Sequence, residues 1–245
     1  MPMSTAVTAA RARTERVGGR TGHPPRDCRG RRWAWGAVAA LLTAFLGLAA
    51  WVGVQGALPF DAPLLHRMRA WHGGPLDEAS RLVSALGHGW GVVPVDIALV
   101  LLLAAARRVR EATFAAAALG GSGLLVVGLK RVFARERPSL WEPLASEHTF
   151  SFPSGHAMGS MTLAAVLVAL AWPTRWRWPV AVGMGAFVLA VGASRVHLGV
   201  HYPSDVLAGW TCAVAWTLLV YLWVSGHVAR GGRPGPWRRN RPGSA

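Results

Sequence analysis

The stretch PSGHAMGSMTLAAVLVALAW (Pro153–Trp172) places a knot of polar and turn-forming residues directly before an almost wholly apolar run. The run from Met161 onward is apolar on every face, as a helix surrounded by lipid or by other helices would be. Ser154 suits the position that caps the start of such a helix. We therefore predict a membrane-embedded helix with a polar cluster at its mouth.

The composition of the whole chain favours a membrane protein. Of the 245 residues, 52% are hydrophobic and only 15% are charged, and 13 are Trp, a residue that favours the lipid–water interface. The 26 Lys and Arg against 11 Asp and Glu give a formal net charge of +15. This excess does not indicate nucleic-acid binding, because the Arg residues gather in the tails and in short loops between apolar runs.

Six apolar segments match the length needed to cross a bilayer core of about 30 Å, or approach it. They are Trp33–Val54, Trp90–Ala106, Ala112–Leu129, His156–Trp172, Trp178–Ala193 and Ser204–Val224. The flanking residues 1–32 and 229–245 are rich in Arg, Gly and Pro, which predicts disordered tails. Residues 33–228 are then one membrane domain.

A further amphipathic segment, Asp61–Gly89, lies between the first two spans. Its apolar residues at helical spacing predict a short helix on the membrane surface; they are Leu64, Leu65, Met68 and Trp71.

The basic residues predict the orientation of the six spans. Both tails are basic, and so are the loops after the second and fourth spans, which contain Arg107, Arg108, Arg110, Arg175 and Arg177. An even number of spans puts all of these on one side, which the positive-inside rule makes cytoplasmic. The loop after the third span faces outward and is also basic, since it contains Lys130, Arg131, Arg135 and Arg137. The positive-inside rule does not explain why these four cations occur in this loop, so another explanation is needed.

The first outward cluster is KRVFARERP, in which six residues separate Lys130 from Arg137. If the third helix continues through this segment, the two cations lie two turns apart on one face and form a clamp for an anion. The alternative is that these cations are anchors that reach the lipid–water interface. We prefer the anchor interpretation for Arg131 and Arg135.

The second outward cluster is the PSGH motif itself. The free backbone N–H groups at a helix start bind phosphate well, and Gly155 lets a ligand approach the backbone closely. His156 would stand at the mouth of the fourth span, where it can exchange a proton near neutral pH. Taken alone, the motif is more typical of an ordinary capped helix with an incidental His.

The third outward cluster is SRVHLGVHYPSD, which contains Arg195, His201 and Asp205. Asp205 falls in the first turn of the sixth helix, about one turn from His201. A carboxylate that holds one imidazole nitrogen leaves the other free as a nucleophile. The alternative is a helix-capping Asp beside an interfacial His. His197 has no partner at comparable spacing, and we interpret it as structural.

Together the clusters hold the groups needed for phosphoryl transfer through a phosphohistidine. They resemble the three-part signature of the type-2 phosphatidic acid phosphatase superfamily of integral membrane lipid phosphatases. The matching residues are Lys130, Arg137 and Pro138, then Pro153 to His156, then Ser194, Arg195, His201 and Asp205. The resemblance implies an all-α bundle of six transmembrane helices in the cell membrane, with both termini cytoplasmic and the active site at the extracytoplasmic face.

The resemblance also implies a role for each matched residue. His201 attacks the phosphorus and is oriented by Asp205, while His156 protonates the leaving group. The residues implied to hold the phosphate oxygens are Lys130, Arg137, Ser154, Gly155 and Arg195. No metal or other cofactor is expected, and the expected partner is a membrane lipid rather than a nucleic acid. Undecaprenyl diphosphate is the first candidate substrate, ahead of phosphatidate and phosphatidylglycerophosphate.

Three alternatives stay open. Vanadium haloperoxidases share the signature, although they are soluble and six apolar spans disfavour them. A polytopic transporter or lipid-binding protein would use the His and Arg residues to line a pathway, which the pairing of a His with an Asp disfavours. A phosphotransferase that passes phosphate from His201 to another lipid is compatible with the sequence.

Overall fold

The computed structural model describes residues 26–230, and every regular element in that range is an α-helix, as predicted. In chain order these are α2 (Arg26–Gln55), α3 (Asp61–Arg69), α4 (Pro75–Leu86), α5 (Val92–Ala105), α6 (Val109–Phe133), α7 (Gly155–Ala171), α8 (Arg177–His197) and α9 (Pro203–Arg230). The predicted tails lie outside the described residues, apart from the helical residues 26–32 and 229–230. The chain divides into two units at Ala34, and the following description concerns the unit that begins there.

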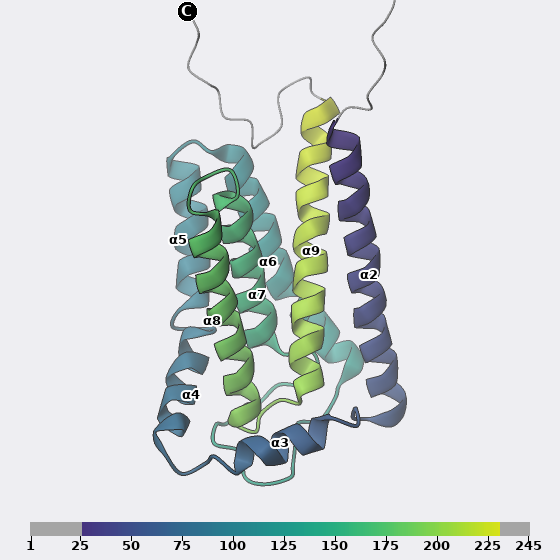
Figure 1. Cartoon of the computed structure of the whole chain (residues 1–245), viewed down its shortest axis with the longest axis vertical. Helices are drawn as coiled ribbons and strands as arrows, with labels where there is room; N and C mark the ends of the chain where they lie inside the picture. Colours follow the sequence, from purple (N-terminus) through teal and green to yellow (C-terminus); the bar gives the residue numbers. More distant parts are fainter. Residues whose placement is uncertain (1–25, 231–245) are drawn as a thin grey trace, which may run out of the picture. The chain divides into compact units, whose positions relative to one another are not determined.

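Each of the six predicted spans coincides with a helix. By length and composition α2, α6, α8 and α9 are able to cross a membrane, whereas α5 and α7 are apolar but shorter. The short α5 is preceded by α4 along the same edge of the bundle (Figure 1), and the Trp90 N–H donates to the Ala85 carbonyl at 3.2 Å in the connection between them. The two helices together therefore extend farther along the bundle than α5 does alone.

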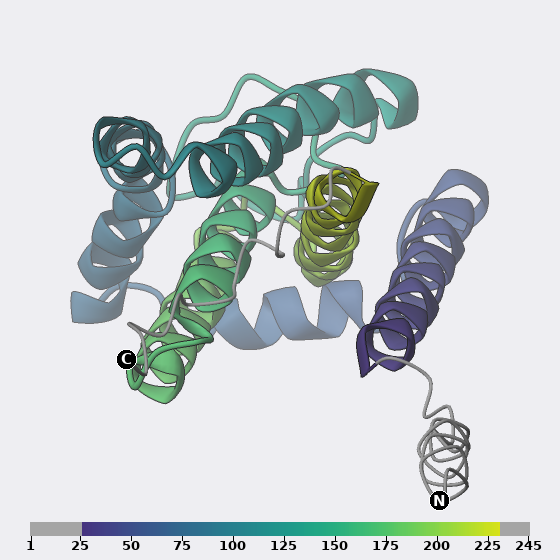
Figure 2. The same cartoon turned by 90° about the horizontal axis from the view of Figure 1, so that it is seen from above.

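Helices α5 to α9 run up and down beside one another, and α3 lies across one end of them (Figures 1 and 2). We call this the α3 end. It also carries the α6–α7 loop (residues 134–154) and the α8–α9 turn (residues 198–202), whereas the opposite end carries the short turns 106–108 and 172–176. The predicted surface segment is thus two helices, α3 and α4, rather than one.

Apolar side chains cover the outside of the helices as well as filling the inside. Leu124 and Val132 of α6 are 79% and 76% exposed, and Leu102 of α5 is 68% exposed. Isolated apolar residues on a surface are ordinary, but helices that are apolar all round are typical of membrane spans. The lipid-facing surface therefore agrees with the membrane-protein prediction.

Clusters of buried apolar side chains fix the helices that carry the polar residues. One cluster joins α2 to α7 and α9 through Phe45, Met158 and Ala213. Another anchors α3 beneath α7, α8 and α9, where the fully buried Leu65 packs with Ala157, Val196 and Val206. The α3 end is consequently a packed platform on which loops from several helices meet.

Candidate active site

The three motif clusters of the sequence, which are predicted to face outward, meet at the α3 end. Each predicted residue lies at or just beyond the end of a helix that points to this end: Lys130 on α6, Arg137 on the α6–α7 loop, Ser154, Gly155 and His156 at the start of α7, Arg195 on α8, His201 on the α8–α9 turn and Asp205 on α9. Four separate helix ends thus contribute to one site.

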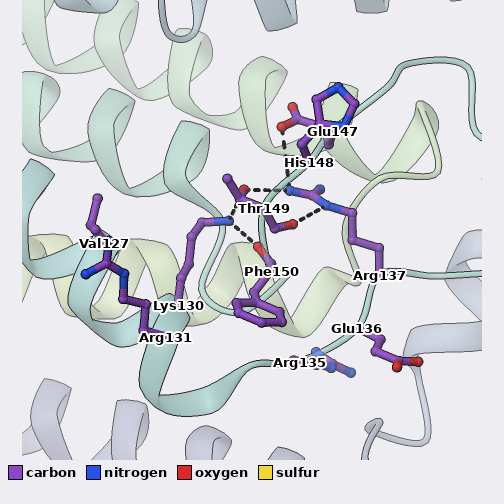
Figure 3. Close-up of a pocket in the computed structure, with 10 residues that line it drawn as sticks. All are labelled: Val127, Lys130, Arg131, Arg135, Glu136, Arg137, Glu147, His148, Thr149 and Phe150. Atoms are coloured by element: carbon purple, nitrogen blue, oxygen red, sulfur yellow. Dashed lines mark hydrogen bonds and ion pairs between the residues drawn. The ribbon is translucent and has the colours of Figure 1, made fainter.

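The first cluster is built differently from the prediction. Helix α6 ends at Phe133, and Ala134 takes a left-handed conformation with a φ of 43°. Lys130 and Arg137 therefore do not lie two turns apart on one helical face, and that prediction is wrong. The two cations still converge, because Lys130 Nζ donates to Thr149 Oγ1 at 3.1 Å and Arg137 Nε donates to the Thr149 carbonyl at 2.7 Å (Figure 3).

Arg137 and Arg195 hold one carboxylate between them. Arg195 Nη2 donates to Glu147 Oε1, and Arg137 Nη2 lies 3.5 Å from Glu147 Oε2. Arg195 is only 2% exposed and also donates to Ser84 Oγ of α4. Guanidinium groups bind carboxylates and phosphates with the same fork geometry. The two arginines therefore form an anion site, which the protein's own Glu147 fills.

A pocket of about 500 Å³ opens beside Lys130 and Arg137, whereas the buried Arg195 and His201 are not among its lining residues. Figure 3 shows Lys130 and Arg137 pointing toward Thr149 from opposite sides, with Glu147 beyond the Arg137 guanidinium. The lining also includes two partly exposed apolar side chains, Val127 and Phe150. The pocket thus combines a cationic wall with apolar residues from α6 and the α6–α7 loop.

His201 lies next to the anion site, and its two ring nitrogens face different partners. Nδ1 lies 3.4 Å from Asp205 Oδ2 and 3.3 Å from Ser151 Oγ, while Nε2 lies 3.3 Å from Arg137 Nη1. A guanidinium can only donate, so Nε2 is the acceptor and Nδ1 carries the proton. The nitrogen that carries no proton therefore faces the anion site, where its lone pair accepts from Arg137.

Burial sets the charge of His201. The side chain is almost completely buried, and this burial lowers its pKa well below the ordinary value of 6.5; the charges of Arg195, Arg137 and Lys130 lower the pKa further. Burial also lowers the pKa of Arg137, although a guanidinium stays protonated. At neutral pH the site thus presents a neutral imidazole among fixed positive charges.

The start of α7 places His156 on the same site. Its ring lies 4.8 Å from the ring of His88, which comes from the α4–α5 connection. The positive charges of Arg195 and Lys130 are close enough to interact with the His156 ring. Ser154 occupies the cap position, but its side chain makes no capping bond, and its buried Oγ has no partner among the described residues. This buried hydroxyl is therefore not used to cap the helix.

Arg135 departs from its predicted role as an interfacial anchor. Its side chain is 6% exposed and forms ion pairs with Asp205 Oδ1 and, at 3.1 Å, with Asp61 Oδ2. Sequence reasoning missed this pairing and also missed Ser151 and Glu147. Arg135, Ser151 and Glu147 all stand outside the matched positions of the three motifs. The only sequence signal for Arg135 was the excess of basic residues in the loop after the third span, which the positive-inside rule does not explain. Arg131, which was given the same interpretation, is exposed as expected for an anchor.

His197 lies away from the reactive groups. It is 2% exposed, and its Nε2 lies 2.8 Å from Asp77 Oδ1 of α4. His72 Nε2 lies 2.7 Å from the His197 carbonyl oxygen. These contacts tie the α3–α4 connection to α8, which agrees with the interpretation of His197 as structural.

Comparisons with known proteins point to one family. The model of the PAP2 superfamily matches residues 111–229. A decaprenylphosphoryl-5-phosphoribose phosphatase of Mycolicibacterium smegmatis is 37% identical over 61% of this chain and 80% of its own length. An undecaprenyl-diphosphatase of Sulfolobus acidocaldarius is 31% identical over 69% of this chain and 82% of its own. The crystal structure of a transmembrane PAP2-type phosphatidylglycerolphosphate phosphatase from Bacillus subtilis is similar, with a TM-score of 0.69, 25% identity and coverage of 83% of this chain and 98% of that one.

Proposed function

Since the chain belongs to the PAP2 superfamily and is a membrane phosphoric ester hydrolase, we propose that it removes phosphate from a lipid phosphate or diphosphate, with undecaprenyl diphosphate as the preferred substrate. One observation carries the proposal: the anion site made by Arg137 and Arg195 lies directly beside the unprotonated Nε2 of His201, which contacts Arg137 itself. An anion held there presents its central atom to a neutral nucleophile.

The first half of the proposed reaction forms a phosphohistidine. The substrate phosphate replaces the Glu147 carboxylate between the two arginines, and Lys130 adds a third positive charge. His201 Nε2 attacks the phosphorus, and the bond from phosphorus to the leaving oxygen breaks, with its electron pair going to that oxygen. The negative charge of the bound phosphate offsets the neighbouring cations, so that His156 takes up a proton from solvent before the step and then gives it to the leaving oxygen. Asp205 stabilises the positive charge on His201 through the Nδ1 proton.

The second half restores the enzyme. A water molecule attacks the phosphorus while His156 takes one of its protons, and the electron pair of the N–P bond returns to His201. The Ser154 hydroxyl and the Gly155 N–H, at the start of α7, donate to the phosphate oxygens as negative charge grows on them. Phosphate then leaves, and Glu147 returns to the arginines.

The shape of the pocket supports a lipid substrate. Its cationic wall suits a phosphate, while the exposed Val127 on α6 and Phe150 on the α6–α7 loop add apolar surface. A prenyl or acyl chain would stay in the bilayer, which avoids an extraction cost of about 0.8 kcal/mol per CH₂. With six spans and cytoplasmic termini the site faces outward, where a carrier lipid is released during wall synthesis, and we therefore rank undecaprenyl diphosphate first. The Bacillus subtilis structure, matched over 98% of its length, makes phosphatidylglycerophosphate the second candidate.

A substrate panel tests this ranking. Phosphate release would be measured in detergent micelles from undecaprenyl diphosphate, phosphatidylglycerophosphate, phosphatidate and a soluble sugar phosphate. The highest kcat/KM is expected for undecaprenyl diphosphate. A preference for either glycerolipid would overturn the ranking alone, whereas a preference for the sugar phosphate would overturn the lipid assignment.

The covalent intermediate gives a separate test. Brief incubation with ³²P-labelled substrate should label the wild-type protein, and His201→Ala should abolish both labelling and turnover. His156→Ala should slow labelling by about 10²–10⁴-fold, the usual contribution of a general acid. His66→Ala, an exposed histidine of α3, serves as the matched control. Near-normal activity in His201→Ala would exclude the mechanism.

A further inference from the structure

A buried group of charges lies behind His201, on the side away from the anion site, and only one of its members, Asp205, belongs to the signature. It consists of Arg135, Asp61 and Asp205, with side chains that are 6%, 0% and 0% exposed. The three come from the α6–α7 loop, the start of α3 and the first turn of α9. Two carboxylates and one guanidinium in so buried a place need a structural or a functional reason.

Asp61 is a rigid anchor for this group. Its Oδ1 accepts from the Ser204 N–H at 2.9 Å, and its Oδ2 accepts from the Leu58 N–H at 3.0 Å and from Ser204 Oγ at 2.6 Å. Arg135 Nη2 adds the 3.1 Å ion pair to Oδ2. The carboxylate is thus held by four donors, and it fixes one side of the guanidinium.

The guanidinium in turn fixes Asp205. Arg135 Nη1 donates to Asp205 Oδ1 and, at 2.9 Å, to Ser204 Oγ, while its guanidinium carbon lies 3.9 Å from the centre of the Tyr202 ring. The opposite oxygen of Asp205, Oδ2, accepts from Ser151 Oγ at 2.5 Å and from the Tyr202 N–H at 2.9 Å. With Oδ1 held by Arg135, Oδ2 is the oxygen that faces His201 Nδ1.

We propose that Arg135 is a positioning residue for the nucleophile: it locks the Asp205 carboxylate so that Oδ2 keeps the proton of His201 on Nδ1 and leaves Nε2 free to attack. Asp61 is the counter-anchor that keeps the guanidinium in place. The inference rests on the proposed phosphohistidine mechanism. Arg135 itself is bonded to carboxylates rather than aimed at the anion site, so it acts through Asp205.

If Arg135 is only structural, restoring the stability of an Arg135 variant should also restore its activity. If Arg135 positions Asp205, restoring the stability should leave the activity low. The three side chains carry a net charge of about −1, which becomes about −2 in Arg135→Met because two buried carboxylates lose their cation. The double variant Arg135→Met/Asp61→Asn returns the net charge to about −1 and removes the unpaired carboxylate of Asp61. It should therefore regain thermal stability without regaining the lock on Asp205.

The kinetic experiment uses four variants of the full chain in detergent micelles, assayed with the best substrate of the panel. Arg135→Met and the double variant should each lose about 10–100-fold in kcat with KM within about twofold, since misplacing a reacting group by about 1 Å costs about 10²-fold. Asp61→Asn keeps a side-chain oxygen that can accept from Arg135 Nη2, so the guanidinium stays on Asp205 and kcat should stay within about threefold. Arg108→Met breaks an ion pair with Glu111 at the other end of α6 and should be normal. Recovery of kcat together with stability in the double variant, or an equal loss in Asp61→Asn, would overturn the proposal.

The tautomer of His201 gives a readout that needs no turnover. In protein labelled with ¹⁵N-histidine, the ring signals lost in His201→Ala belong to His201. They should report a single Nδ1–H tautomer in the wild type and a mixture in the double variant. An unchanged tautomer would overturn the role of Arg135 whatever the substrate is. A wild-type protein that forms no phosphoenzyme would instead overturn the proposed function and leave the tautomer test in force.

Discussion

The proton on the His201 ring determines what this residue can do. The neutral form is the nucleophile, and the protonated form is not. Because burial and the neighbouring cations lower the His201 pKa, the neutral form persists at pH values where an exposed histidine is already protonated. The same cations that we propose to bind the substrate anion thus also keep His201 in its neutral form.

This leads to a prediction for the pH dependence of kcat/KM. Activity is present while His201 is neutral and falls as the pH drops through its pKa, so the acidic limb should lie below pH 6.5, the ordinary value. His156→Ala should keep that limb, because a general acid governs the alkaline side of the profile. The measurement is kcat/KM on a lipid substrate between pH 4 and 9, a range of about five units around the ordinary histidine pKa. An acidic limb at or above pH 6.5 would contradict the assigned environment of His201.

Sequence reasoning at this scale succeeded where residues stand in a motif and failed where partners are distant. The spacing of His201 and Asp205 predicted their contact, since residues in adjacent turns of one segment are neighbours in space. Arg135 and Asp61 are 74 positions apart, and no local pattern connects them. Their burial depends on how α3 packs across the bundle, which a single sequence does not reveal.

At the scale of elements, the crossing of α7 and α9 sets the geometry of the site. The two helix starts are joined by the Ser154 N–H, which donates to the Asp205 carbonyl at 3.0 Å. Their close approach depends on Gly209, where an added Cβ would lie 2.8 Å from the Ser154 carbonyl oxygen and 3.2 Å from the Met158 nitrogen. Small residues commonly allow such approaches between membrane helices.

Replacing this glycine should separate the two helices. Gly209→Ala forces a backbone contact to relax, and overpacking of this kind costs about 1–3 kcal/mol. We expect a lower melting temperature in micelles and a loss of kcat, because Asp205 and the start of α7, which we propose binds phosphate, shift relative to one another. Gly183→Ala in α8 is the matched control, since an added Cβ there meets nothing within 4 Å and alanine favours a helix. Wild-type stability and activity in Gly209→Ala would show that the contact is not needed.

The predicted helices agree with the structure where a local sequence signal exists and differ from it where none does. All six apolar runs are helices, because long apolar runs have few other ways to satisfy their backbone in a membrane. The prediction was wrong about the end of α6, since the RVFARERP sequence contains no glycine or proline before Pro138 to mark a stop at Phe133. The division between α3 and α4 did have a local signal, because Gly73, Gly74 and Pro75 separate them and Pro favours a helix start.

At the scale of the whole molecule, two groups of basic residues lie at opposite ends of the bundle and differ in their contacts. At the end opposite the site, the short turns and helix starts carry Arg107, Arg108, Arg110, Arg175 and Arg177. At the α3 end the cations are engaged with specific partners: Lys130 with Thr149, Arg135 with Asp61 and Asp205, and Arg137 and Arg195 with Glu147. The proposed roles in binding and positioning therefore explain why the α6–α7 loop is basic although it is predicted to face outward.

This assignment predicts that the two ends lie on opposite sides of the membrane, with the α3 end outside. Single cysteines at the exposed positions Glu142, on the α6–α7 loop, and Arg175, on the α7–α8 turn, test it in the full chain with Cys28 and Cys212 changed to Ser. A membrane-impermeant maleimide should label Glu142→Cys in intact cells and Arg175→Cys only after permeabilisation. The positive-inside rule gives the direction, because the arginines of the two short turns favour the cytoplasmic side.

Labelling of both positions in intact cells would mean that an even number of crossings separates them, which is incompatible with α7 as a single span. Labelling of Arg175→Cys alone would invert the orientation, place the phosphate site in the cytoplasm and remove the main reason for ranking undecaprenyl diphosphate first.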